Sequence, residues 1–401
     1  MDLVTRRKFL IGSGVTGALA IAAGGTAVGL RDILATAGDR DPDARTLVLV
    51  TLYGGNDGLN TVIPYADPAY AAARPHLAYP AEQVLRLDDE FALNPAMTGL
   101  HRLFGAGGLA IVHGVGYPRP DHSHFRSMDI WQTADPVRPG TTGWLGRWLD
   151  GAGGDPRLAV SFEPTLPPLL AGATSAGATV PGGQVTLAKI ATPQLLEALG
   201  TPAVGESAAR ARAATCFADL IRIQDLMTDV SADTEDDDTA ATATGGAAPP
   251  LDAQLALVAK CVEAGAATRV YSVSLGGFDL HADERTAQES QLAKLDRPLA
   301  AFIERMRGKG VVVAVYSEFG RRVRANASDG TDHGTASCMF LAGDGIRGGM
   351  HGEPPSLTNL DNGDLKHTTD FRDVYATLLA DVLDTDPARV LTGWPGRLKL
   401  S

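Results

Sequence analysis

Short apolar runs rich in β-branched residues recur along this chain, and segments with a helical pattern separate them. The runs span residues 45–52, 109–112, 268–275, 311–316 and 338–342. The helical patterns span residues 127–133, 208–227, 251–264, 288–307 and 370–383. Strands that alternate with helices predict an α/β fold in which helices cover both faces of a mostly parallel sheet.

The N-terminus carries a different pattern. Arg6 and Arg7 precede an uncharged run at 9–30 that is rich in glycine and alanine. These features are typical of a twin-arginine signal peptide, and Ala-Thr-Ala at 35–37 offers a small-residue cleavage pattern. We therefore predict a signal peptide at 1–37, export through the twin-arginine translocon to the periplasm or the medium, and no stable membrane span after cleavage. The alternative is an uncleaved N-terminal anchor, because the run is long enough to cross a bilayer.

The remainder of the chain, 38–401, has the length of one large domain, and we predict a single domain. Two stretches within it differ in composition. Residues 136–205 are rich in glycine, proline and alanine, which predicts a loop-rich region. Residues 231–250 begin with an acidic run and continue with alanine, threonine, glycine and proline, which predicts a disordered surface insert. The alternative for this second stretch is a metal-binding acidic run.

Charge and cysteine content exclude some classes of protein. The formal net charge is −12, so nucleic acid is not an expected partner, because phosphate backbones bind to basic surfaces. The three cysteines (Cys216, Cys261 and Cys338) are odd in number and form no Cys-x-x-Cys pair, which argues against a disulfide framework or a zinc knuckle. A chain of this kind suits folding in a reducing cytoplasm before export.

Polar clusters follow the predicted strands. The clusters lie at 54–61, 121–125, 276–281, 317–322 and 330–334. In an open α/β sheet, ligands bind outside the carboxyl ends of the strands, so these clusters are expected to converge at one edge. Each cluster taken singly has a simpler interpretation. The cluster at 54–61 is also typical of a turn or a helix cap, and the pair at 332–333 is also typical of a surface turn. Glu318 could simply form an ion pair with the arginines that follow it.

The residue types in these clusters suit a divalent metal. Carboxylates and imidazoles bind zinc, manganese, magnesium or calcium rather than a metal that seeks thiolates. The candidate metal ligands are Asp57, Asp279, His281, Glu318, Asp332 and His333.

A candidate nucleophile lies in the second cluster. Ser123 begins a helical segment, and the free backbone N–H groups of a helix N-terminus favour a phosphate or sulfate group. A bound metal would activate the hydroxyl for attack. Arg126 lies one turn further on and is expected to clamp the anion. His122 and His124 flank the serine, and polar side chains at this density are costly to bury without a role.

Several motifs together resemble the exported bacterial family known as domain of unknown function fifteen-oh-one. They are LYGGNDGLNTVIP at 52–64, DHSHFRSMDIWQT at 121–133, LGGFDLHAD at 275–283, YSEFGRR at 316–322 and GTDHGTASCMFLAGDGIRGG at 330–349. That family is considered similar to the alkaline phosphatase and sulfatase superfamily. The resemblance implies an alkaline-phosphatase-like fold, a first ligand at Asp57, a nucleophile at Ser123 and a last ligand at His333.

The chain also departs from the superfamily pattern. Glu318 and Phe319 stand where an Asp-His pair is usual, and Asp279 and His281 lie closer together than the usual pair. These departures weaken the case for two metals and leave three hypotheses: a metal-dependent hydrolase of an anionic phosphate or sulfate ester, a non-catalytic exported protein that binds an anionic glycan or envelope component, or a metal-binding partner of a co-exported surface protein.

Overall fold

A computed structural model describes residues 26–27, 30–138, 140–163, 165–180 and 249–399. The predicted helix at 208–227, the predicted insert up to residue 248 and most of the predicted signal peptide lie outside these ranges. The main sheet has the order β1-β8-β7-β9-β2-β10-β11-β6-β12, and β13 also pairs with β6. In that order the strands span Thr26–Ala27, Ala178–Thr179, Ala159–Ser161, Val270–Leu275, Thr46–Leu52, Val311–Ser317, Ser337–Gly343, Leu109–Gly116 and Gly349–His351, with β13 at Thr369–Asp370.

Most neighbouring strands of this sheet are parallel. The exceptions are the two pairings of β11, which runs antiparallel to β10 and to β6. Strand β2 is central, and its residues pair in parallel with β10 on one side and with β9 on the other. The α/β fold with a mostly parallel sheet, predicted from the alternating pattern, is confirmed.

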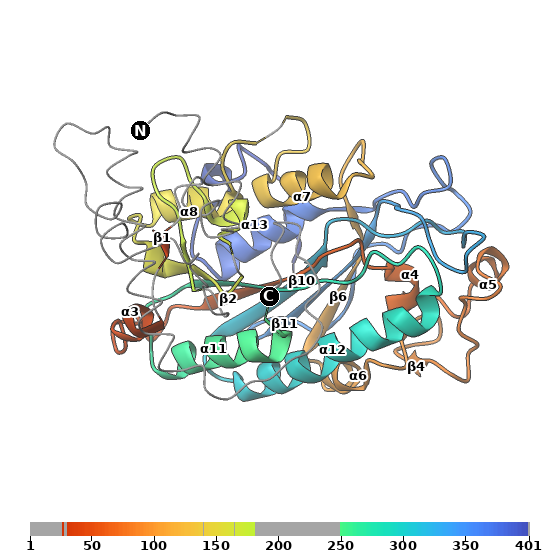
Figure 1. The fold of residues 1–401 in the computed structure, drawn as a ribbon, viewed down its shortest axis with the longest axis horizontal. Helices are drawn as coiled ribbons and strands as arrows, with labels where there is room; N and C mark the ends of the chain where they lie inside the picture. The colour runs from red at the N-terminus through yellow and green to blue at the C-terminus, as the bar shows by residue number, and fades with distance from the viewer. Residues whose placement is uncertain (1–25, 28–29, 139, 164, 181–248, 400–401) are drawn as a thin grey trace, which may run out of the picture.

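Helices cover both faces of the sheet (Figure 1). On one face lie α6 (Thr98–Gly105), α11 (Leu251–Glu263) and α12 (Glu284–Arg305). On the other lie α7 (His124–Thr133), α8 (Trp144–Gly151) and α13 (Phe371–Asp381). A small sheet of β3 (Val62–Ile63), β5 (Ala92–Leu93) and β4 (Leu85–Arg86) and the short helices α4 (Gly58–Thr61) and α5 (Pro68–Ala73) follow β2 along the chain.

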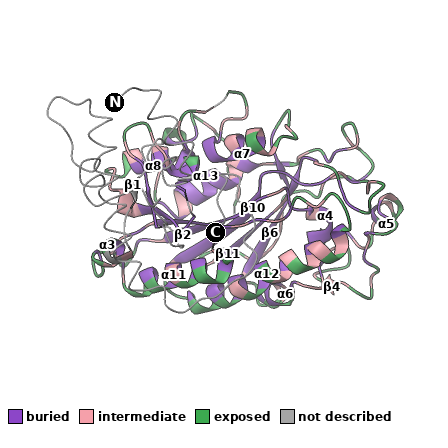
Figure 2. Ribbon diagram, in the orientation of Figure 1, coloured by how far each residue is buried: buried purple, intermediate pink, exposed green. Residues whose placement is uncertain are grey.

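The period-two alternation of the strands divides the core into two layers. In β2, Val48 and Val50 point into the layer shared with α11 and α12, whereas Leu47 and Leu49 point into the layer shared with α8 and α13. All four are fully buried, and Figure 2 shows the sheet buried along its length. A strand covered on both faces needs apolar residues at every position, which is why the segment reads as a continuous apolar run.

The stretch predicted to be rich in loops contributes to this sheet where it is described. Strands β7 and β8 come from it and extend the sheet beyond β9. Two single-turn helices, Pro156–Leu158 and Pro168–Leu170, flank β7, which accounts for the weak periodicity of the sequence there.

The segment before the predicted cleavage position packs against the body. Helix α3 spans Leu30–Leu34, and Ile33 is fully buried in the core layer of α11 and α12. The Thr36 hydroxyl accepts a hydrogen bond from the backbone N–H of Ala267, and the N–H of Gly38 donates to the carbonyl oxygen of Gly265, each at 3.0 Å. Cleavage after residue 37 stays a prediction. Across the described ranges, no helix combines the length and the apolar character that a bilayer crossing requires.

Candidate metal centre

Side chains from three strand ends meet at one edge of the main sheet. Asp279 follows β9, and His124 begins α7 after the loop that leaves β6. His333 precedes β11, and because β11 runs against its neighbours, its start lies at the edge where β6 and β10 end. The convergence expected at the carboxyl edge of the sheet therefore occurs for these three residues.

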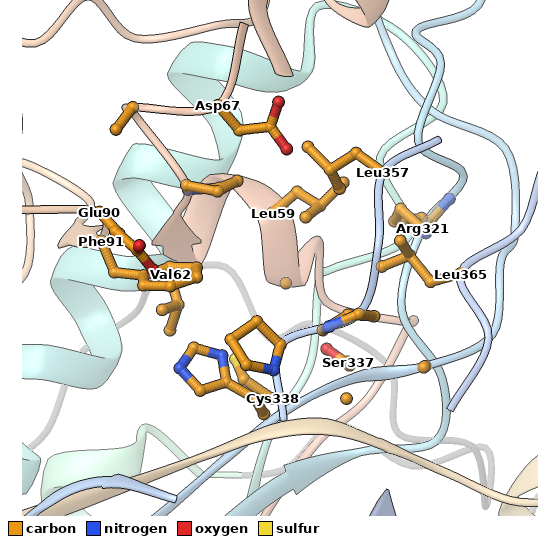
Figure 3. A pocket seen from close by; sticks show the side chains of 18 residues that line it. Leu59, Val62, Asp67, Glu90, Phe91, Arg321, Ser337, Cys338, Leu357 and Leu365 are labelled. Carbon is orange, nitrogen blue, oxygen red and sulfur yellow. The ribbon is translucent and has the colours of Figure 1, made fainter. Parts of the chain in front are cut away.

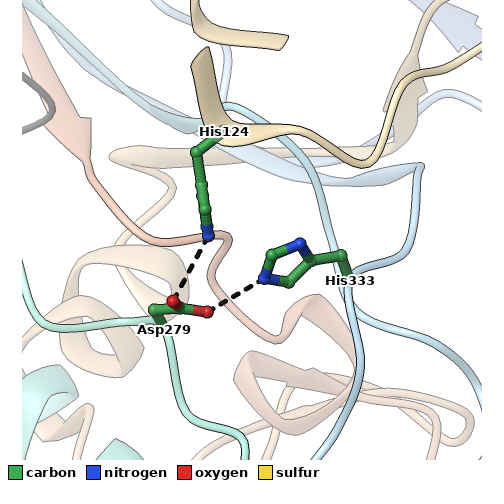
Figure 4. Close-up of side chains that lie close together, drawn as sticks. All are labelled: His124, Asp279 and His333. Atoms are coloured by element: carbon green, nitrogen blue, oxygen red, sulfur yellow. Dashed lines mark hydrogen bonds and ion pairs between the residues drawn. The ribbon is translucent and has the colours of Figure 1, made fainter. Parts of the chain in front are cut away.

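The three side chains face one another (Figure 4). One ligand atom from each of His124, Asp279 and His333 lies within 4.8 Å of the other two. His333 Nε2 is 3.0 Å from Asp279 Oδ1, and His124 Nε2 is 3.4 Å from Asp279 Oδ2. Within the described ranges, this is the one group of three such residues with the spacing of a metal site.

The other ring nitrogen of each histidine fixes what these atoms can do. His124 Nδ1 donates to Glu318 Oε1 at 2.8 Å, and His333 Nδ1 donates to the carbonyl oxygen of His122 at 2.7 Å. A neutral imidazole has one N–H, so Nε2 of both rings carries a lone pair. In this tautomer the two lone pairs face the oxygens of Asp279, and a cation between the three side chains would bind to all of them.

A divalent cation fits this arrangement. The Nε2 atom of His124 is buried and makes no hydrogen bond, which is the state of a ligand atom before its metal binds. Two imidazole nitrogens and one carboxylate oxygen suit zinc and other transition metals, whereas calcium and magnesium prefer oxygen ligands throughout.

His281 and Asp332 lie at the solvent side of this group. His281 Nε2 is 2.9 Å from Asp279 Oδ1 and 3.0 Å from His333 Nε2, so it lies within hydrogen-bond distance of two members of the group. Asp332 is more exposed, and its carboxylate is 3.9 Å from His281 Nδ1. Asp279 and His281 lie in a loop after β9, and their side chains meet through the turn of that loop.

Glu318 lies behind His124, and Arg321 lies behind Asp279. Arg321 Nη2 is 2.7 Å from Asp279 Oδ1, and the guanidinium also donates to the carbonyl oxygens of Gly54 and Gly55. Burial would raise the pKa of Asp279, but the hydrogen bond and the positive charge of Arg321 outweigh it and hold that pKa well below its usual range. The simpler interpretation of the sequence, an ion pair of Glu318 with the nearby arginines, is wrong, because Glu318 bonds to His124 and Arg321 to Asp279.

Asp57 does not join the group. Its carboxylate forms a buried ion pair with Arg74 and accepts the backbone N–H of Leu59, so it caps α4. Arg74 also donates to the carbonyl oxygens of Arg322 and Val323. The structure thus corrects the expectation that Asp57 lies with Asp279 and His333, because an arginine already neutralises this carboxylate.

Ser123 lies directly beside the group along the chain. Its two neighbours contact the group, His124 through its ring and His122 through its carbonyl oxygen. Ser123 is the exposed N-cap residue of α7, and its hydroxyl makes no capping hydrogen bond. Ser123 thus begins the helix as predicted, and its role as a nucleophile stays a prediction.

The side chains of His122 and Arg126 point to other partners. His122 Nε2 is 2.9 Å from Asp364 Oδ2, and Arg126 forms an ion pair with Asp129 one turn along α7. The arginine expected to clamp an anion is therefore already paired. His124, predicted as one of the residues around the nucleophile, is instead a candidate ligand.

Two cavities border the residues of this region. One, of about 380 Å³, lies against Arg321 and between Leu59, Phe91 and Leu357 (Figure 3), with Asp67 and Glu90 in its wall. The other, of about 590 Å³, is lined by His122 and Phe319, which both touch the metal group, and carries the cationic Arg119, Arg322 and Lys366 beside the acidic Asp361 and Asp364. Each cavity has two carboxylates in its lining, but the second has three cationic side chains where the first has one, so the second suits an anion better.

Sequence reasoning missed Arg74 as the partner of Asp57 and Arg321 as the partner of Asp279. Arg74 lies in the turn after α5, and nothing in its local sequence distinguishes it from a surface arginine. Arg321 had a signal, because it follows Glu318 within a motif, but that signal did not indicate which carboxylate it contacts.

The fold and this group define an α/β protein with a candidate metal centre at the strand ends. The chain belongs to the family described as "Protein of unknown function (DUF1501)", whose model matches residues 138–399. The family predicted from the motifs is confirmed. No curated protein matches the sequence.

Several solved structures are similar in fold. A protein in the alkaline phosphatase superfamily from Vibrio parahaemolyticus is 9% identical, with 93% of this chain and 78% of that chain covered and a TM-score of 0.42. The lipoteichoic acid synthase LtaP from Listeria monocytogenes is 10% identical, with 94% and 80% covered and a TM-score of 0.39. The C-terminal periplasmic domain of EptC from Escherichia coli, in complex with zinc, is 11% identical, with 76% and 75% covered and a TM-score of 0.35. No residue role is carried over from these proteins.

Proposed function

We propose that this chain is an exported, metal-dependent hydrolase that acts on a phosphate or sulfate ester. The observation that carries the proposal is the buried Nε2 of His124, which makes no hydrogen bond and lies 3.4 Å from Asp279 Oδ2, beside the Nε2 of His333. His124, Asp279 and His333 would hold the metal, with His281 as a fourth ligand. A metal at this position supplies a Lewis acid that stabilises negative charge on the oxygens of the ester.

Ser123 is the proposed nucleophile. Its hydroxyl oxygen attacks phosphorus or sulfur and gives up its proton to solvent, the new O–P or O–S bond forms as the bond to the leaving alcohol breaks, and the alcohol takes up a proton from solvent. Water then attacks the seryl phosphate or sulfate, the bond to the serine oxygen breaks, inorganic phosphate or sulfate leaves, and the serine regains a proton. Backbone N–H groups at the start of α7, a ten-residue helix, lie around the same point and favour the anionic group in both steps.

The cavity next to His122 and Phe319 supports an anionic substrate. Its three cationic side chains, Arg119, Arg322 and Lys366, outnumber its two carboxylates, Asp361 and Asp364, although the chain as a whole is acidic. Local positive charge of this kind would attract an ester anion toward the edge of the sheet. The leaving group is expected to occupy this cavity.

Binding without turnover is the second candidate function. Two groups expected to take part in catalysis are engaged elsewhere, Asp57 with Arg74 and Arg126 with Asp129. A protein that binds an anionic glycan or another envelope component through the metal would need neither of them.

A substrate panel separates these two functions. The full chain loaded with zinc is assayed with p-nitrophenyl phosphate and p-nitrophenyl sulfate, beside Ser123→Ala, His333→Ala and the control His76→Ala, which changes an exposed histidine elsewhere. The proposal expects turnover by the wild type and His76→Ala, and a loss of at least about 100-fold in both site variants. Zinc binding without turnover would support the binding protein, and equal activity in Ser123→Ala would remove the serine from the mechanism.

Export rests on Arg6 and Arg7, which we propose bring the folded chain to the twin-arginine translocon. Folding before export would let the cytoplasm load the metal. The double variant Arg6→Lys, Arg7→Lys should remain in the cytoplasm, as measured by fractionation of cells. An unchanged distribution would contradict this route.

A further inference from the structure

Glu318 was expected to bind the metal, but its surroundings give it another task. The carboxylate is 1% exposed, and both of its oxygens have partners. Oε1 accepts the backbone N–H of Gly54 at 2.9 Å and His124 Nδ1 at 2.8 Å, while Oε2 lies 2.9 Å from the Ser317 hydroxyl. To reach a metal the carboxylate would have to leave these partners in the interior.

We infer that Glu318 is a positioning residue that holds His124 with its proton on Nδ1 and its Nε2 lone pair turned toward Asp279 and His333. This inference rests on the proposed metal site. An imidazole exchanges readily between two tautomers, and the hydrogen bond made by one nitrogen decides which nitrogen is left to bind a metal. A carboxylate behind a histidine ligand has this effect, and its loss typically costs 10- to 100-fold in metal affinity.

Phe319 completes the support from the other side. Its ring centroid lies 4.9 Å from that of His124 and 4.9 Å from that of His333, and the side chain is buried. Any Cβ at Gly55 would lie 2.2 Å from the Phe319 ring, so only glycine leaves room for the phenyl group. Glu318 therefore orients the imidazole of His124 by a hydrogen bond, and Phe319 restricts the imidazoles of His124 and His333 by packing. The superfamily pattern has an Asp-His pair at these two positions.

The arrangement also leaves two carboxylates that were expected to be ligands without a free oxygen for a second metal. Asp57 is paired with Arg74, and Glu318 is saturated by its own hydrogen bonds. Neither carboxylate is free to build a second centre beside the first. The residues at the strand ends thus divide into ligands and supports.

The test uses the hydrogen-bonded Nδ1 proton of His124. In histidine-labelled full chain, a downfield imidazole ¹H–¹⁵N signal, assigned with a His124→Gln variant, should be present in the wild type. It should be retained in Glu318→Gln, whose amide oxygen still accepts the bond, and lost in Glu318→Ala. Glu353→Gln, an exposed change, is the matched control and should leave the signal unchanged.

Zinc affinity, measured by calorimetry on the same proteins, distinguishes a support from a ligand. For a support, Glu318→Ala should weaken zinc binding by about 10- to 100-fold, while Glu318→Gln weakens it by less than about tenfold. If Glu318→Gln loses zinc as completely as Asp279→Asn, Glu318 is a ligand and the inference fails. If the wild type binds no zinc, the proposed function fails, and the Nδ1 signal still decides the role of Glu318: its persistence in Glu318→Ala would overturn the inference.

Discussion

Glu163, at the end of β7, is a carboxyl group enclosed by the protein interior. It is fully buried, and it contacts the Tyr53 hydroxyl at 3.0 Å and the Ser272 hydroxyl at 3.1 Å. Burial raises its pKa to about 7, and the hydrogen bonds of its neighbours only partly oppose that shift. The folded protein therefore holds a proton at Glu163 under conditions in which the unfolded chain has released it.

This shift predicts a loss of stability as the pH rises. Because the folded-state pKa lies above the unfolded value, the contribution of Glu163 is complete below about pH 4.5 and is lost as the pH rises to about 7. The total loss is on the order of 3 kcal/mol. Glu163→Gln removes this contribution, so urea unfolding at several pH values should show a smaller decline across this range than in the wild type. An identical decline in both proteins would show that Glu163 does not titrate in this way.

The Asp57–Arg74 pair gives a second prediction for single residues. Both side chains are fully buried, so removal of the arginine leaves a charge without compensation. We expect Arg74→Met to lower the free energy of unfolding by about 3–5 kcal/mol, and the double variant with Asp57→Asn to recover part of the loss. Urea denaturation measures both. Equal stability of the single and double variants would show that the charge of Asp57 is not what makes Arg74 necessary.

At the scale of the elements, the apolar runs predicted the central strands well. Strands β2, β9, β10 and β11 lie within two residues of their predicted ranges. Continuous burial on both faces produces a strong local signal, which is why these strands could be predicted. The reversed direction of β11 could not, because a strand has the same composition in either direction. That reversal brings His333 to the site.

The site was only partly predictable for a related reason. Asp279, His281 and His333 follow or precede strands whose positions were correct, so their convergence could be expected. Asp57 also follows a correctly predicted strand, yet its carboxylate forms an ion pair with Arg74, 17 residues along the chain. Pairing between distant side chains leaves no trace in the spacing of a motif.

The turn after β2 should be sensitive to a single methyl group. Gly54 has φ +115°, and a Cβ there would lie 2.4 Å from the backbone nitrogen of Asp279. Gly54→Ala should therefore destabilise the fold by about 1–3 kcal/mol beyond the cost of the positive φ, and it should weaken zinc binding by displacing Asp279. Gly107→Ala is the control, since Gly107 has φ +71° and open space around a Cβ. If both changes lower the temperature of thermal unfolding equally, the close contact between the loop of Gly54 and the loop of Asp279 does not contribute to stability.

On the scale of the whole molecule, the N-terminal segment is joined to the body. Ile33 fills a position in the core layer of α11 and α12, and Thr36 and Gly38 bond to the turn after α11. A chain that starts at Gly38 lacks the buried side chain of Ile33. Its free energy of unfolding should therefore be lower than that of a chain that starts at Leu30, by about 1.5–3 kcal/mol. Chemical denaturation of the two truncated chains measures the difference. If the two are equally stable, the contacts of α3 add nothing to the folded body.

The central claim is a metal centre formed by His124, Asp279 and His333, and zinc titration tests it most directly. Calorimetry on the chelator-stripped full chain should give one zinc per chain, with the affinity reduced at least about 100-fold in His333→Ala and in Asp279→Asn and unchanged in His76→Ala. Absence of zinc binding, or equal binding by the wild type and the His333→Ala and Asp279→Asn variants, would contradict the account.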